Sequence, residues 1–291
     1  MSATDGYFPR GTSMLRRVHE QRAVGLMYGQ RALGIGAIAP LNFVGTRLHS
    51  RSLDKPFHRL AHTGKAFETI FFGSRADADR VLGFVERLHQ DVRGELPAAA
   101  GPVPAGTPYS AFDPELMLWT VAVMADSAQY FYELFVGRLT PSERDALWRD
   151  YIRFGELFGM PREAAPPCYA DFRDWWDAEL ASERVHLTDE ARYVGSAIMF
   201  QIPVPASRRL AMQVHNLVML GSLPARVREL YGLRWSRAQA AAFRAVVGGL
   251  RATRPLSPEA ARVGRNTRSF DLVADTERER IARGDAVPGA L

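Results

Sequence analysis

The sequence feature that most restricts the fold is a long apolar stretch at residues 114–137, which reads PELMLWTVAVMADSAQYFYELFVG. Asp113 is a favoured helix N-cap directly ahead of a proline, so a helix is expected to begin here. The stretch is apolar around most of a helical circumference, and its polar exceptions are Asp126, Ser127 and Gln129. Because such a helix is stable only when other elements surround it, we predict that it is central and buried.

Helical spacing recurs in the rest of the chain. Ser74 can cap a helix whose apolar side chains return at intervals of three and four residues until Gly94, where we expect the helix to end. Further helix starts are indicated by Thr140 with Glu143, Ser236 with Gln239, and Thr188. No segment alternates apolar and polar residues as a strand does. We therefore predict an all-α protein, with a single domain over residues 1–264 and a polar tail over residues 265–291.

Composition excludes several classes of protein. The formal charge is +5, but stretches such as TERERIAR mix both signs, so no basic stripe for nucleic acid is present. Cys168 is the only cysteine, which excludes an internal disulfide and a cysteine-rich zinc site. The first residues lack the apolar core of a secretory signal, and no apolar run is long enough to span a bilayer. We expect a soluble cytoplasmic protein without stable membrane insertion.

Common catalytic motifs are also missing. The sequence has no phosphate-binding glycine loop, no G-x-S-x-G nucleophile elbow and no H-E-x-x-H zinc motif. The segment GIGAIAP resembles half of a dinucleotide fingerprint, but a helical stretch precedes it where the fingerprint requires a strand. Phosphate, dinucleotide and zinc-protease chemistry therefore have no support in the sequence.

The histidines leave several interpretations open. His89 lies on the apolar face of its predicted helix, where it can be either a hydrogen-bonded core residue or a haem ligand. His58 and His62 share one helical face, but no third ligand for a zinc ion is evident. Two Glu-x-x-His pairs, Glu86 with His89 and Glu183 with His186, have the spacing found in di-iron helical bundles. A non-haem di-iron enzyme is therefore an alternative.

Taken in order, five stretches of the chain resemble the MpaB and latex-clearing-protein family of haem b-dependent oxygenases. The resemblance covers roughly residues 10–235 and is carried by HSRSLDKPFHRLAHT, FETIFFGSRADADRVLGFVERLHQDVRG, YSAFDPELMLWTVAVMADSAQYFYE, LTPSERDALWRDYIRFGELFGMP and LGSLPARVRELYGLRW. It implies a mostly helical, globin-like core that binds haem b. The family's Arg-x-x-x-Thr motif falls on Arg59 and Thr63, and its proximal haem histidine falls on His89.

The sequence departs from the family pattern at two places. Rubber-cleaving members carry a lysine immediately before the motif threonine, and His62 stands there in this chain. A neutral imidazole is a better iron ligand than a protonated amine, so His62 could bind iron on the distal side or donate a hydrogen bond there. Many members also carry a His-Pro pair where this chain reads Ala39-Pro40, and no acidic residue follows in APLNFVG. Cleavage of polyisoprene by the family's route is therefore in doubt.

The resemblance implies an oxidoreductase that oxidises an organic, hydrophobic substrate with O₂ or peroxide. His89 would be the proximal iron ligand and His62 a distal one, while Arg59, His62 and Thr63 would order the catalytic pocket. An electron donor would be a further partner if the reaction needs a reductant. The rival hypotheses are the di-iron enzyme and a non-enzymatic haem carrier or sensor with two histidine ligands.

Overall fold

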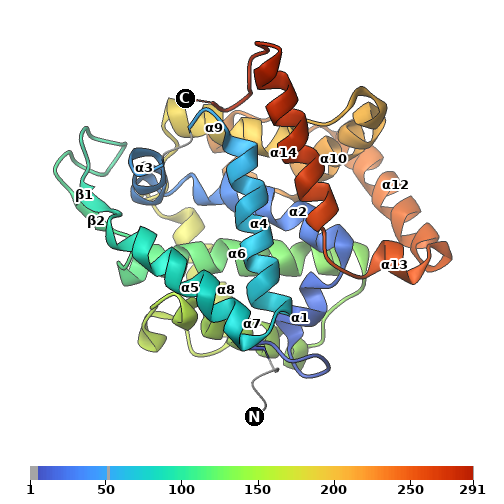
Figure 1. The fold of residues 1–291 in the computed structure, drawn as a ribbon, viewed down its shortest axis with the longest axis horizontal. Coiled ribbons are helices and arrows are strands. Elements are labelled where there is room, and N and C mark those ends of the chain that lie inside the picture. Colours follow the sequence, from blue (N-terminus) through green and yellow to red (C-terminus); the bar gives the residue numbers. More distant parts are fainter. Residues whose placement is uncertain (1–5, 51–52, 291) are drawn as a thin grey trace.

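The computed structural model describes residues 6–50 and 53–290, and these residues form a predominantly helical structure (Figure 1). The prediction of an all-α protein is confirmed. The first helices are α1 (Met14–His19), α2 (Arg22–Gly36), α3 (Pro40–Leu48), α4 (Pro56–Phe72) and α5 (Arg75–Gln90). They are followed by α6 (Pro114–Phe135), α7 (Pro141–Leu157), α8 (Tyr169–Ala181), α9 (Asp189–Phe200) and α10 (Arg209–Ser222). The last are α11 (Ala225–Tyr231), α12 (Arg237–Thr253), α13 (Glu259–Arg262) and α14 (Thr267–Ala282).

Helix α6 is the centre of the structure, as its apolar circumference predicts. It crosses behind α4 and packs most extensively against α2, with α7 on another side (Figure 1). Its buried side chains come from every side of the helix and join one continuous apolar core. The polar exception Asp126 accepts hydrogen bonds from the buried Arg31 (Nη1 to Oδ2, 2.7 Å) and from Arg173 (Nη1 to Oδ1, 2.7 Å). These two guanidinium groups neutralise a carboxylate that the core would otherwise leave unpaired.

The predicted helix starts are confirmed. The Ser74 hydroxyl accepts a hydrogen bond from the Asp77 amide at 3.2 Å, and the Asp113 carboxylate accepts from the Glu115 amide at 2.9 Å. The capping boxes form as predicted, and their pairs are Thr140 with Glu143 and Ser236 with Gln239. Thr188 caps α9 through the amide of Ala191. Each of these caps satisfies a backbone donor that a helix leaves free at its first turn.

The predicted end of α5 at Gly94 is wrong. The helix ends at Gln90, and residues 93–95 form strand β1 (Arg93–Glu95), which pairs antiparallel with β2 (Pro108–Ser110). Gly94 stands opposite Tyr109 in this ladder, and its φ is not positive. Residues 93–95 therefore form a strand where the spacing predicted the last helical turn. Their backbone groups are satisfied by hydrogen bonds with Pro108–Ser110.

The C-terminal segment lies against the rest of the chain. Helix α14 runs beside α4, with which it makes one of the most extensive helix pairs of the structure (Figure 1). The segment expected as a polar tail from residue 265 therefore contains a packed helix, whereas the domain boundary at residue 264 stays a prediction. In the part of the chain that the structure describes, no helix is both long enough and apolar enough to cross a membrane.

Candidate functional site

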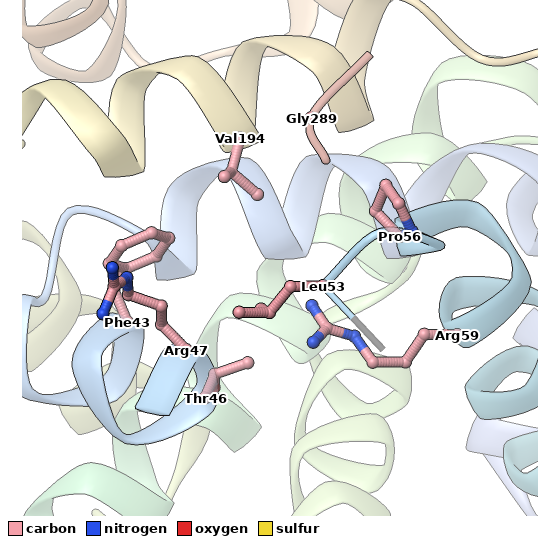
Figure 2. A pocket seen from close by; sticks show the side chains of 8 residues that line it. All are labelled: Phe43, Thr46, Arg47, Leu53, Pro56, Arg59, Val194 and Gly289. Carbon is pink, nitrogen blue, oxygen red and sulfur yellow. The ribbon is translucent and has the colours of Figure 1, made fainter. Parts of the chain in front are cut away.

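Arg59 lies in the first turn of α4, and its guanidinium lines a surface depression (Figure 2). The residues lining the depression are Phe43, Thr46, Arg47, Leu53, Pro56, Arg59, Val194 and Gly289. Its enclosed volume is about 20 Å³, which is room for about one water molecule. The depression is therefore a shallow contact point for a ligand group and does not enclose a ligand.

One of the two arginines that line this depression lacks an acidic partner among the described residues. Arg47 forms an ion pair with Glu190. Arg59 donates a hydrogen bond to the Ser50 hydroxyl, and no described carboxylate pairs with it. Burial lowers the pKa of Arg59 from its ordinary value, because the charged guanidinium is only partly solvated. A half-buried cation without an acidic partner favours an anionic group of a ligand.

The other two residues predicted on α4 face outward. Thr63 is exposed and its hydroxyl donates to the Arg59 carbonyl at 3.1 Å. His62 is also exposed, and its ring lies against that of His58 with centroids 4.4 Å apart. Partial burial, followed by the nearby His58 and Lys65, lowers the pKa of His62. The His62 imidazole is therefore neutral at neutral pH and able to act as a ligand or hydrogen-bond partner.

His89 lies in the last turn of α5, with its ring partly buried against Phe112 (centroids 6.2 Å apart). Burial lowers the pKa of His89, so its ring is neutral. The Nδ1 atom is buried and has no hydrogen-bond partner among the described residues. A buried polar atom without a partner is unusual, and a neutral imidazole with a free nitrogen is the form that binds metal.

Helix α5 exposes large apolar side chains beside this histidine. Phe84 is 55% exposed and Leu88 is 47% exposed, and both lie within the two turns that lead to His89. Within α5 only Ala78 is fully buried. Since exposed phenylalanine and leucine side chains next to one another favour contact with another apolar body, this face of α5 is suited to an apolar group.

Two residues that the sequence did not single out connect the surroundings of Arg59 with those of His89. The His49 imidazole bonds to the Tyr109 hydroxyl (Nε2 to Oη, 3.0 Å), and the next residue, Ser50, accepts from Arg59. Tyr109 in turn packs beside Gly45 and Gly94, close to the end of α5. No local pattern could indicate this link, because His49 and Tyr109 are far apart in sequence.

The structure does not combine the two Glu-x-x-His pairs. Glu86 and Glu183 are both exposed, and the ring of His186 lies against Gly101 in the loop between β1 and β2. Among the described residues, no three histidine, cysteine, aspartate or glutamate side chains are close enough to share a metal ion. The di-iron arrangement of Glu86, His89, Glu183 and His186 is therefore not assembled.

Comparisons with known proteins identify the family to which the chain belongs. Residues 16–252 match the profile described as ER-bound oxygenase mpaB/B′/rubber oxygenase, catalytic domain. The chain is 29% identical over 209 residues to the uncharacterized protein Mb2261 of Mycobacterium bovis, and the match covers 71% of this chain and 78% of the relative. The same values hold for the uncharacterized protein Rv2237 of Mycobacterium tuberculosis.

The comparison with solved structures found no match. The profile match covers most of the chain, and it includes Arg59, His62, Thr63 and His89. The match ends before α14, so the last helix lies outside the shared catalytic domain. The family is one of oxygenases, which makes this chain an enzyme of that class. The protein therefore belongs to the mpaB and rubber oxygenase catalytic-domain family.

Proposed function

We propose that the protein is a haem b-dependent oxygenase that oxidises a hydrophobic organic substrate with O₂ or peroxide. The observation that carries this proposal is the neutral, partly buried His89 ring, whose Nδ1 atom has no partner. Phe84 and Leu88 expose an apolar face on the same helix. A cofactor that needs one imidazole ligand fits the His89 ring, and the helices around it would form a globin-like haem core.

The residues present fit such a cofactor in their chemistry. His89 would bind the iron on the proximal side, and Arg59 would hold a carboxylate of the macrocycle at the edge of the depression. When bound, haem b supplies activation of O₂ or peroxide. The chain itself would contribute a cationic group at Arg59, a neutral imidazole at His62 and a hydroxyl at Thr63, which becomes available if it leaves the Arg59 carbonyl.

The role of His62 would determine whether the iron keeps a free position for a small ligand. Its neutral ring can bind iron on the distal side, or it can donate a hydrogen bond to a small ligand. Because a neutral imidazole can do either, a haem carrier or sensor with two histidine ligands is the second candidate function. His62→Ala separates the two: an oxygenase loses a distal hydrogen bond, whereas a carrier changes from six- to five-coordinate iron.

The test of the proposed function is the absorption spectrum of the purified protein, with pyridine haemochrome analysis and titration of added haemin. We expect a Soret band in the wild type that is abolished or greatly weakened in His89→Ala. His186→Ala is the matched control, because this second histidine of a Glu-x-x-His pair lies beside Gly101, apart from the proposed site. A colourless protein that takes up no haemin would refute the proposal, as would full haem binding by His89→Ala.

A further inference from the structure

The first turn of α4 is capped by a residue from the far end of the chain. The amides of Phe57 and His58 have no carbonyl partner within the helix, as is usual for the first turn. Both donate to the carboxylate of Glu277 on α14, at 3.0 Å to Oε1 and 2.6 Å to Oε2. Lys55, the N-cap residue, makes no side-chain cap of its own. Glu277 itself is 0% exposed, so its carboxylate is enclosed by the surrounding chain.

The opposite end of the two helices has the reciprocal arrangement. Glu68 on α4 accepts hydrogen bonds from the Asn266 amide and, at 2.8 Å, from the Thr267 hydroxyl at the start of α14. Between the two ends, Lys65 pairs with Asp271 across the helices. The two antiparallel helices are therefore joined at three levels, and a shift of α14 would disturb the first turn of α4.

Arg59 follows directly after the two capped residues. Its amide makes the first hydrogen bond within the helix, to the Lys55 carbonyl at 3.2 Å. Its guanidinium lines the depression that Gly289, beyond the end of α14, also lines (Figure 2). The C-terminal segment therefore both holds the turn that carries Arg59 and supplies part of the wall that the guanidinium faces.

We propose that Glu277 is a positioning residue for the oxygenase site: by fixing the first turn of α4, it sets the orientation of Arg59 in that turn and of His62 one turn later. This inference rests on the proposed function for the role of Arg59 and His62. It gives α14 a role in the oxygenase site. This helix lies outside the family's catalytic domain, because the profile match ends at residue 252. Glu277 acts through α4 and contacts no reacting group.

The decisive variant is Glu277→Gln. The side chain keeps its size, but its amide has only one acceptor oxygen and turns an NH₂ group toward the second backbone donor. Glu279→Gln is the matched control, since Glu279 is exposed on the same helix and undergoes the same chemical change. Asp271→Asn is a milder second variant, which removes only the ion pair to Lys65 and serves if Glu277→Gln does not fold.

The first measurement needs no cofactor. The rate at which phenylglyoxal modifies Arg59 is followed by mass spectrometry, with the exposed Arg80 as an internal reference. We expect Glu277→Gln to raise the Arg59 rate by about threefold or more, because loosening of the first turn frees the guanidinium. Asp271→Asn should raise it less, and Glu279→Gln should leave it unchanged.

The second measurement uses the haemin-loaded protein. We expect Glu277→Gln to shift the Soret maximum and weaken cyanide binding in the same direction as Arg59→Ala, whereas Glu279→Gln keeps wild-type values. A lower unfolding midpoint with an unchanged Arg59 rate and spectrum would reduce Glu277 to a purely stabilising residue and overturn the inference. If the wild type takes up no haemin, the proposed function fails, and the Arg59 rate alone still decides whether Glu277 positions this turn.

Discussion

Glu68 on α4 and Glu277 on α14 each cap the N-terminus of the other's helix. Both carboxylates are buried, with Glu68 only 8% exposed. A carboxylate at a helix N-terminus satisfies free backbone donors and interacts favourably with the helix dipole. The pair therefore gives an otherwise polar C-terminal segment a fixed place on the helix that carries Arg59 and Thr63, the residues predicted for the family's Arg-x-x-x-Thr motif.

Replacement of Glu68 by glutamine should loosen the start of α14. The variant leaves either the Asn266 amide or the Thr267 hydroxyl without its acceptor, so we expect a loss of about 1–3 kcal/mol in the free energy of unfolding. Urea denaturation measures this change. Glu86→Gln on the exposed face of α5 is the control and should alter the unfolding free energy by no more than about 0.5 kcal/mol. Equal effects of the two variants would contradict the capping role.

The contact between α4 and α14 can be tested at Gly64. A Cβ atom at this position would lie 2.9 Å from Cε2 and 3.0 Å from Cζ of Phe270. We expect Gly64→Ala to cost about 1–3 kcal/mol, because the Phe270 ring must move within a packed interface.

Gly83 on α5 supplies the comparison. The nearest atom to a Cβ there is Nη1 of Arg87 at 3.7 Å, so Gly83→Ala meets no obstacle. Alanine is also the better helix former, and a gain of up to about 1 kcal/mol is expected. Thermal unfolding of both variants gives the result. A stabilised Gly64→Ala protein would show that α14 does not pack as closely as the structure indicates.

Arg59 should matter for ligand binding more than for stability. Arg59→Met keeps the hydrocarbon part of the side chain and removes a partly desolvated charge that has no described acidic partner. We expect the unfolding free energy to stay within about 1 kcal/mol of the wild type. Haemin affinity should fall about tenfold, since a charge-assisted bond to a carboxylate is lost.

Arg87→Met, at an exposed position on α5, is the matched control for Arg59→Met. Haemin titration followed at the Soret band and urea denaturation separate the two effects. If Arg59→Met were strongly destabilised and still bound haemin with wild-type affinity, Arg59 would be a structural residue and would have no role in holding the cofactor.

His19 makes the stability of the fold depend on pH. Its ring is buried against Tyr28 and Phe71, bonds to the Tyr151 hydroxyl at 2.7 Å, and burial lowers its pKa from 6.5 to about 3. In the unfolded chain His19 takes up a proton near pH 6.5, whereas the folded protein resists protonation until about pH 3. Acidification through this window therefore favours the unfolded state.

Between pH 7 and pH 4 the wild type should lose roughly 3 kcal/mol more unfolding free energy than His19→Gln, which cannot titrate there. Tyr151→Phe keeps the buried imidazole and should retain the steep pH dependence. Urea unfolding at several pH values measures both. Parallel pH profiles for the wild type and His19→Gln would show that the buried ring does not govern acid stability.

Local sequence patterns determined the helical class, the central position of α6 and the helix starts at Ser74, Asp113, Thr140, Thr188 and Ser236. Each cap joins residues within three positions of one another, so the information lies in a short window. The resemblance also indicated the family, which the profile match confirms. The roles of Arg59, His62, Thr63 and His89 stay predictions, although the structure supplies a free nitrogen at His89.

Only the tertiary structure decided which distant groups satisfy one another. The early end of α5 depends on the pairing of β1 with β2, and the link from His49 to Tyr109 joins α3 to that ladder. The cap that Glu277 places on α4 spans 220 residues of sequence. A buried carboxylate or backbone amide must find a partner, but its partner is chosen by how the helices pack, and no spacing within the sequence records that choice.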